Sequence, residues 1–160
     1  MGSEERRPGY HGLQAYQKAD DLAVAIYSFC GKLPARARFL ADQSCRAAVS
    51  VPANIAEGYD RKSPKEYLRA LWIARGSLAE VEYYIHFMQR VKLVDHPTAA
   101  GLENLRGETA RLLFSLIRAL RLKYEGTDAG GTLREGQAPY GEEGASEADV
   151  DPMAHDSMTP

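Results

Sequence analysis

The sequence lacks several features that would each assign the protein to a particular class. Its 160 residues contain two cysteines, Cys30 and Cys45, without the Cys-x-x-Cys spacing of redox and zinc motifs, so a disulfide-stabilised extracellular fold is not expected. No stretch approaches the roughly 20 apolar residues that a membrane helix requires. Residues 1–9 lack the apolar run of a secretory signal. We therefore expect a cytoplasmic protein with reduced thiols and no membrane contact.

Motifs for metal-dependent or nucleophilic catalysis are also missing. Di-iron sites in helical bundles use Glu-x-x-His, and none of the four histidines has a glutamate three positions before it. Glu82 and His86 are four residues apart, and a surface pair explains them better than a metal site. Ser77 follows Gly76 inside a predicted helix, whereas serine nucleophiles of the elbow type lie on a strand-to-helix turn. The sequence predicts no catalytic residue, no metal and no cofactor.

One enzymatic alternative stays open. Some helical-bundle ribonucleases carry an arginine followed a few residues later by a histidine, and Arg90 and His96 have this spacing. His96 precedes Pro97 in a predicted turn, where a polar residue that caps a helix is the simpler explanation. A ribonuclease is therefore the third interpretation, after two non-enzymatic ones.

Charge is distributed unevenly along the chain. Residues 126–160 contain eight acidic residues and one basic residue, a net charge of −7, while residues 1–125 contain 14 acidic and 19 basic residues, a net charge of +5. Residues 125–160 are nearly free of large aliphatic side chains and cannot bury enough apolar surface to offset the entropy of ordering. We predict a flexible N-terminus (1–9), one folded domain (10–124) and a disordered acidic tail (125–160).

The folded domain shows the three- and four-residue apolar spacing of amphipathic helices and no strand-like alternation. Four such segments are predicted at residues 13–32, 35–59, 63–92 and 98–124. Helices of this length joined by short turns predict an all-α, up-down-up-down four-helix bundle.

Local signals mark the helix ends. Ser63 and Glu66 form a capping box around Pro64 at the first helical position. Pro34 is expected in the first turn of the second helix and Gly58 at its end. Pro52 lies inside the same helix and predicts a kink, because it removes one backbone donor.

The second predicted helix carries polar side chains on a mostly apolar face. The polar residues of this stripe, spaced by seven, four and three positions, are Gln43, Ser50, Asn54 and Glu57. Burying such groups without hydrogen-bond partners costs roughly 1–3 kcal/mol each. In an antiparallel bundle the third helix can supply partners, and its glycine permits close backbone approach. We predict a structural network that sets the helix register, formed by Gln43, Arg46, Ser50, Asn54, Glu57, Gly76, Ser77 and Glu80.

The bundle topology brings the start of the first helix, the second turn and the end of the last helix to one end. Basic residues only slightly outnumber acidic residues there, so nucleic-acid binding at this end is expected to be non-specific and salt-sensitive, and a merely solvated charged rim is the alternative explanation. The candidate nucleic-acid-binding residues are Lys18, Arg61, Lys62, Lys65, Arg69, Arg118, Arg121 and Lys123.

The third helix has more large aromatic residues than one core stripe needs. Spare aromatics are typical of protein interfaces, so they indicate self-association; the alternative is a helix buried on all sides. The residues concerned are Tyr67, Trp72, Tyr83, Tyr84 and Phe87.

These motifs resemble a known bacterial family. The Gln-x-x-Arg-Ala opening at residues 43–47, the run SVPANIAEG at 50–58, the cap at Ser63 and Glu66, and Gly-Ser-Leu-x-Glu at 76–80 are similar to the four-helix-bundle proteins encoded in intervening sequences of 23S rRNA genes. Residues 16–19, Tyr-Gln-Lys-Ala, resemble the first helix of that family. The resemblance covers residues 13–120.

The resemblance implies a homopentamer and no established catalytic activity. The family is related to the accessory variability determinants of diversity-generating retroelements, which bind nucleic acid and a reverse transcriptase through a basic surface. We therefore expect a non-enzymatic oligomeric scaffold, a self-associating ring that binds RNA, DNA or a protein such as a reverse transcriptase. The alternative is a purely structural or protein-interaction oligomer without nucleic-acid contact.

Overall fold

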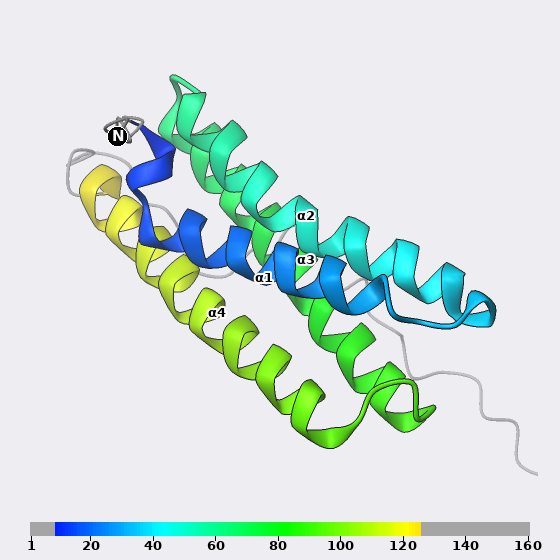
Figure 1. Ribbon diagram of the computed structural model, residues 1–160. Coiled ribbons are helices and arrows are strands. Elements are labelled where there is room, and N and C mark those ends of the chain that lie inside the picture. The colour runs from blue at the N-terminus through cyan, green and yellow to red at the C-terminus, as the bar shows by residue number, and fades with distance from the viewer. Residues whose placement is uncertain (1–8, 126–160) are drawn as a thin grey trace, which may run out of the picture. The chain divides into compact units, whose positions relative to one another are not determined.

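The computed structural model describes residues 9–125 and confirms the predicted all-α domain of four helices (Figure 1). The helices are α1 (Gln14–Cys30), α2 (Arg38–Asp60), α3 (Pro64–Arg90) and α4 (His96–Glu125), with short 3₁₀ helices η1 (Tyr10–Gly12) and η2 (Ala35–Ala37) before α1 and α2. The segments predicted to be flexible or disordered, 1–9 and 125–160, lie outside the described residues except for Gly9 and Glu125.

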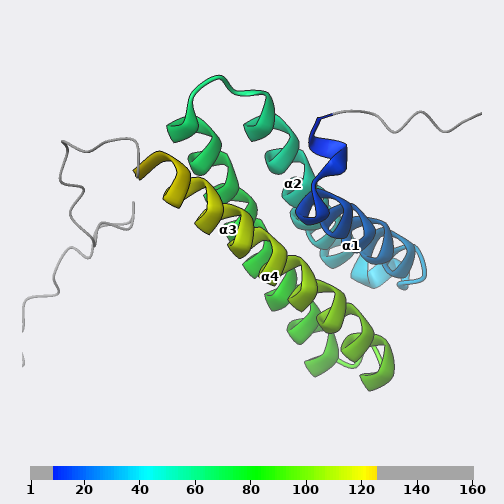
Figure 2. The same cartoon turned by 90° about the vertical axis from the view of Figure 1, so that its left-hand side faces the viewer.

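Each helix packs against two neighbours. α1 contacts α2 and α4, and α3 contacts the same two helices, so α1 and α3 are diagonal within residues 9–125. The views in Figures 1 and 2 show the connection from α2 to α3 at the same end of the bundle as the beginning of α1 and the end of α4. This topology places the predicted basic segments at one end.

The core is formed by one stripe from each helix, at the expected three- and four-residue spacing. Fully burying an aliphatic side chain of this size contributes about 1.5–3 kcal/mol, so these stripes supply most of the driving force for packing. The largest fully buried apolar side chains are Leu22, Ile26, Val51, Ile55, Leu71, Val81, Ile85, Met88, Leu113 and Ile117.

The contact between α2 and α3 is the most extensive in the bundle, and Gly58 makes its closest approach possible. A Cβ atom at Gly58 would lie 2.7 Å from Cδ2 of Tyr67 and 2.8 Å from Cβ of Ala70. The prediction that Gly58 ends the helix was wrong, because α2 continues to Asp60 and buries Gly58 against α3. Gly58 therefore allows α2 to pack closely against α3 and does not end α2.

One proline prediction for α2 needs correction. Pro34 is not in the first helical turn, because its extended backbone precedes the separate 3₁₀ turn η2. Pro52 lies inside α2, which is continuous in Figure 1, and the Pro52 ring is buried. The kink expected from its missing backbone donor stays a prediction.

The beginning of α3 matches the prediction in position but not in hydrogen bonding. Ser63 is the N-cap residue and Pro64 the first helical residue, yet the Ser63 side chain makes no capping hydrogen bond. The Ser63 carbonyl accepts a hydrogen bond from the backbone of Tyr67 at 3.0 Å. The capping-box sequence therefore marks where α3 begins, although the Ser63 side chain does not form the capping hydrogen bond.

The turn from α3 to α4 lies two residues earlier in the sequence than predicted. α3 ends at Arg90, and Lys92 adopts a left-handed backbone conformation with φ of 58°. α4 begins at His96, two residues before the predicted Thr98, and the Asp95 carboxylate accepts a hydrogen bond from the Thr98 backbone at 2.8 Å. This bond lowers the pKa of Asp95 below its usual value.

The close approach at Gly58 predicts opposite effects for two glycine substitutions. Gly58→Ala should lower the free energy of unfolding by about 1–3 kcal/mol, because the added methyl group forces Tyr67 or the backbone to move. Gly101→Ala is the matched control: a Cβ there meets no atom within 4 Å, so it should raise stability by up to about 1 kcal/mol. Urea unfolding of both variants tests this, and equal stabilities would refute it.

The hydroxyl of Tyr67 predicts a second stability effect. It is buried and has no hydrogen-bond partner among the described residues, so Tyr67→Phe should stabilise the fold by about 1 kcal/mol. Burial, followed by the nearby Tyr59 and Tyr124, raises the pKa of Tyr67 to about 12.

Because the folded state holds this proton more tightly than the unfolded state, the contribution of Tyr67 is intact below pH 10 and is lost as the pH rises toward 12. The advantage of Tyr67→Phe, measured by urea unfolding at several pH values, should therefore grow between pH 10 and 12. A constant difference would contradict the assignment.

Candidate nucleic-acid interface

Three residues of the predicted structural network meet between α2 and α3. The Ser50 and Ser77 hydroxyl oxygens lie 2.9 Å apart, and either can donate. Asn54 Nδ2 donates to the Ser50 carbonyl at 2.8 Å and to Ser50 Oγ at 3.0 Å. Ser77 is buried and the other two residues are half-buried, so the group ties the two helices together at the edge of the core.

The other five predicted network residues are not joined to this group. Asn54 does not pair with Glu80, because its amide donates to Ser50 one turn back along α2 while the Glu80 side chain is exposed. Glu57 binds Arg61 instead. Gln43 is half-buried and Arg46 exposed.

The close helix approach expected at Gly76 is absent. A Cβ built on Gly76 meets nothing within 4 Å in the described part of the chain. The helices approach closely at Gly58 instead, because Gly58 lies on the inner side of α2 and Gly76 on the outer side of α3.

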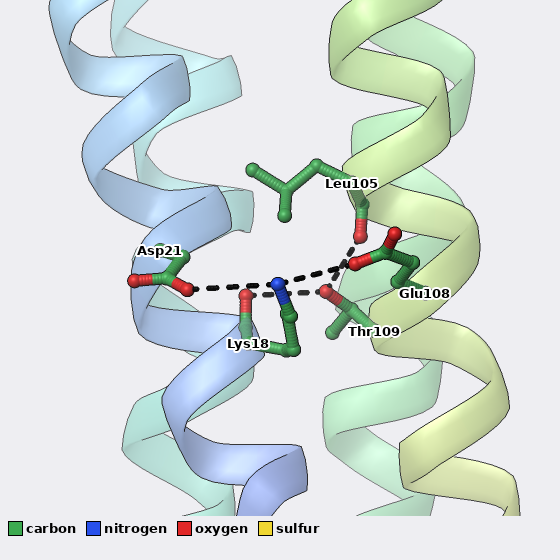
Figure 3. A network of polar contacts seen from close by, with 5 residues as sticks. All are labelled: Lys18, Asp21, Leu105, Glu108 and Thr109. Atoms are coloured by element: carbon green, nitrogen blue, oxygen red, sulfur yellow. Dashed lines mark hydrogen bonds and ion pairs between the residues drawn. The ribbon is translucent and has the colours of Figure 1, made fainter.

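The predicted basic residues divide into paired and unpaired groups. Lys18 lies between α1 and α4, where its Nζ is 3.1 Å from Oε2 of Glu108 and 4.0 Å from Oδ2 of Asp21 (Figure 3). The buried Thr109 hydroxyl beside it lies 2.9 Å from the Leu105 carbonyl oxygen and 3.2 Å from that of Lys18. Lys18 therefore links two helices and has little charge to offer a ligand.

Arg61 is also engaged. Its guanidinium donates to the Glu57 carboxylate one turn earlier, and this bond raises the pKa of Arg61 further above its already high value. Lys123 lies over the ring of Tyr124 at 5.6 Å, and Arg121 sits in the last turns of α4 at the same end of the bundle.

Four of the predicted residues form no ion pair within residues 9–125: Lys62, Lys65, Arg69 and Arg118. All four are exposed. Three of them follow one another from the α2–α3 turn along the first turns of α3. The free positive charge is therefore concentrated at the beginning of α3, and not spread evenly over the end of the bundle.

Sequence reasoning missed two polar residues that hold α4 in place. Arg106 joins α4 to α3, with Nη1 3.2 Å from Oε2 of Glu82 and Nε 2.8 Å from Oε2 of Glu103. Thr109 is fully buried on the α1 side of the helix. The available signal was the position of Thr109 four residues after Leu105 and four before Leu113, on the core stripe.

The groups considered for catalysis are not assembled into a reactive site. The Ser77 hydroxyl bonds another hydroxyl and not a base. Burial and the adjacent Cys45 raise the pKa of the Cys30 thiol to about 12, so it stays protonated at neutral pH. Both cysteines are free. Arg90 and His96, the ribonuclease pair, are exposed at the end of α3 and the beginning of α4.

A shallow groove of about 380 Å³ lies between α3 and α4, and it contains the Glu82–His86 pair. Its two carboxylates, those of Glu82 and Glu103, both form ion pairs with Arg106. Within residues 9–125 no group of three or more His, Cys, Asp or Glu side chains is arranged to hold a metal ion. The groove is lined by Glu82, Tyr83, Ile85, His86, Gln89 and Glu103.

The aromatic residues of α3 divide into core and surface groups. Tyr67 is buried, and Tyr84 and Phe87 are half-buried. Trp72 and Tyr83 retain 40% and 58% of their surface, so these two of the five are the exposed ones.

Comparison with known proteins identifies the family. The family model described as 23S rRNA-intervening sequence protein matches residues 11–115. The chain belongs to the 23S rRNA-intervening sequence protein family. The matched residues contain all four helices up to the last turns of α4, so the family assignment applies to the bundle as a whole.

Two further similarities accompany this membership. A crystal structure of a protein of unknown function from the S23 ribosomal protein family of Bacteroides thetaiotaomicron VPI-5482 shares the fold, with a TM-score of 0.62 and 24% identity over 65% of this chain and 95% of that chain. Ribose import ATP-binding protein RbsA 1 of Streptomyces avermitilis is 30% identical over 109 residues, which are 68% of this chain.

The second similarity concerns a small part of a larger protein, since this chain spans 20% of the length of that relative. Phosphate-binding loops of ATP-binding proteins use Gly-x-x-x-x-Gly-Lys-Ser/Thr, and the sequence contains no such motif. Within residues 9–125 no helix combines the length and the apolar character needed to cross a membrane.

The hydroxyl contact between α2 and α3 predicts measurable coupling. In a double-mutant cycle of Ser50→Ala and Ser77→Ala, the two changes should show a coupling free energy of about 0.5–1 kcal/mol, because each hydroxyl loses its partner when the other is removed. Asn54→Ala and Glu80→Ala form the control cycle and should be additive. Urea unfolding at one protein concentration measures both; equal coupling in the two cycles would contradict the structure.

Proposed function

We propose that this protein is a non-enzymatic, cytoplasmic, oligomeric scaffold that binds RNA or a nucleic-acid-processing protein such as a reverse transcriptase. The observation that carries the proposal is the unpaired basic run of Lys62, Lys65 and Arg69 on the exposed beginning of α3. A surface charge without an internal partner is available to neutralise phosphate groups on a ligand.

The beginning of α3 adds a second favourable field. The first backbone N–H groups of a helix point outward and carry partial positive charge. Because the Ser63 side chain does not cap them, these groups stay open beside Lys62 and Lys65. Glu66 in the first turn opposes this field, so the expected binding is weak for one chain.

Assembly into a closed ring would overcome that weakness. We propose a homopentamer, in which five copies of the basic run contribute to one field. Exposed apolar side chains on the outer faces of the helices support self-association, because they supply apolar surface that a second copy could bury. They include Val24, Tyr27, Phe39, Val49, Ile73 and Phe114.

The same exposed apolar side chains support the second candidate, a purely structural or protein-interaction oligomer without nucleic-acid contact. This candidate predicts a stable oligomer whose mass does not change when RNA is added. The scaffold predicts salt-dependent capture of RNA by the same oligomer.

Reversing the charge of the basic run should abolish RNA binding. Lys62→Glu, Lys65→Glu and Arg69→Glu together should weaken the affinity for single-stranded RNA more than tenfold at low salt and flatten the dependence of affinity on salt concentration, because fewer counterions are released. Fluorescence anisotropy of labelled RNA and light-scattering mass of the protein are measured together.

The control variant carries the same charge change at the opposite end of the bundle, at the exposed residues Arg36, Arg38 and Arg90. It should retain affinity. Equal loss in both triple variants would show that binding follows net charge only, and absence of RNA binding by the unchanged protein would favour the structural oligomer.

A further inference from the structure

Trp72 is the only tryptophan in the chain, and it lies on the outer face of α3. Its side chain keeps 40% of its surface exposed. The guanidinium of Arg75 lies over the indole, 5.0 Å from the ring centroid. This stacking holds the indole in place and leaves aromatic surface available to a ligand.

The surroundings of Trp72 are apolar and positively charged. Arg69 and Arg75 form no ion pair within residues 9–125, and no acidic residue occurs between residues 67 and 79. A ligand that covers the indole therefore meets two arginines without an ion pair, on a stretch of α3 that carries no carboxylate. An anionic ligand with an aromatic group suits this environment.

Space for such a ligand lies next to the indole. Gly76 is one helical turn after Trp72, and a Cβ atom there would meet nothing within 4 Å. Because the side chain is missing and the space around it is open, a flat ring can approach the helix backbone here. Lys65, Arg69, Trp72 and Gly76 share one stripe of α3 at spacings of four, three and four residues.

We propose that Trp72 is a stacking platform for a base of a single-stranded polynucleotide, with the flanking phosphates bound by Lys65, Arg69 and Arg75. This inference rests on the proposed nucleic-acid binding and deepens it, because the basic run alone does not distinguish single strands from duplexes. Bases that are paired in a duplex cannot stack on a side chain, whereas unpaired bases stack on aromatic groups irrespective of sequence.

A second copy of the chain is the competing occupant of this face. Its contact would require acidic groups for Arg69 and Arg75 and an apolar surface that continues along α3. The next large exposed aromatic residue, Tyr83, is 11 residues away, about 16 Å along the helix. Between them lie Gly76, Ala79 and the charged Glu80. These features favour the polynucleotide.

The experiment uses the fluorescence of the single tryptophan as a local reporter. Addition of a short oligouridylate to the full chain should quench the Trp72 emission in parallel with the binding measured by anisotropy of a labelled oligouridylate. Trp72→Ala should weaken that binding about tenfold and Trp72→Phe should restore most of it, because a base loses its stacking partner in the first variant and keeps an aromatic ring in the second. An RNA duplex of equal length should bind both variants and the unchanged protein equally.

Tyr83→Ala is the matched control, since Tyr83 is an exposed aromatic residue on the same helix. The Tyr83→Ala variant should bind oligouridylate with unchanged affinity. Binding of an oligodeoxyuridylate by the unchanged protein tests whether the affinity depends on the ribose 2′-hydroxyl. The stacking role of Trp72 would be overturned if oligouridylate bound without quenching the Trp72 emission, or if Trp72→Ala bound it with undiminished affinity. Either result would leave the proposed function intact.

Two other outcomes would also overturn the platform. Emission that shifts with protein concentration in the absence of RNA, together with a smaller oligomer for Trp72→Ala, would assign this face to a second copy. Absence of any binding of oligouridylate or duplex would overturn the proposed function as well.

Discussion

The close packing of α2 on α3 is the contact on which the remaining geometry depends. Two helices can approach this closely only where side chains are small, and Gly58 opposite Ala70 and Tyr67 satisfies that condition. The same approach brings the Ser50 and Ser77 hydroxyls to 2.9 Å, a distance at which neither is left unsatisfied. A bulkier residue at Gly58 would separate the helices and break this contact together with the packing around Tyr67.

The distribution of ion pairs then decides which basic residues are available. Lys18 of α1 and Arg106 of α4 join neighbouring helices, so their charges are paired with carboxylates of the bundle itself. At the end of α2, Glu57 neutralises Arg61. Lys62, Lys65 and Arg69 have no such partner within residues 9–125, although the whole chain carries a net charge of −2. Local pairing, and not net charge, therefore determines which basic side chains stay without an ion pair in this part of the chain.

The spacing of apolar residues alone predicted the four helices, because a helix with 3.6 residues per turn brings residues three and four positions apart onto one face. The spacing of polar residues also predicted that Ser50, Asn54 and Ser77 belong together. Helix ends were less predictable, since a cap depends on a few hydrogen bonds. Asp95 caps α4, whereas the Ser63 side chain does not cap α3 despite the better sequence signal.

The sequence by itself determined the all-α class, the number of helices, the core stripes and the family, because these follow from apolar spacing and local motifs. Only the tertiary structure decided the roles of individual residues. Gly58 and Gly76 are both helical glycines, yet one fills a tight contact and the other faces open space. Spacing assigns a residue to a stripe, but a small rotation of the helix decides whether that stripe meets a neighbour or solvent. That rotation is set by the packing of all four helices together, which no local pattern encodes.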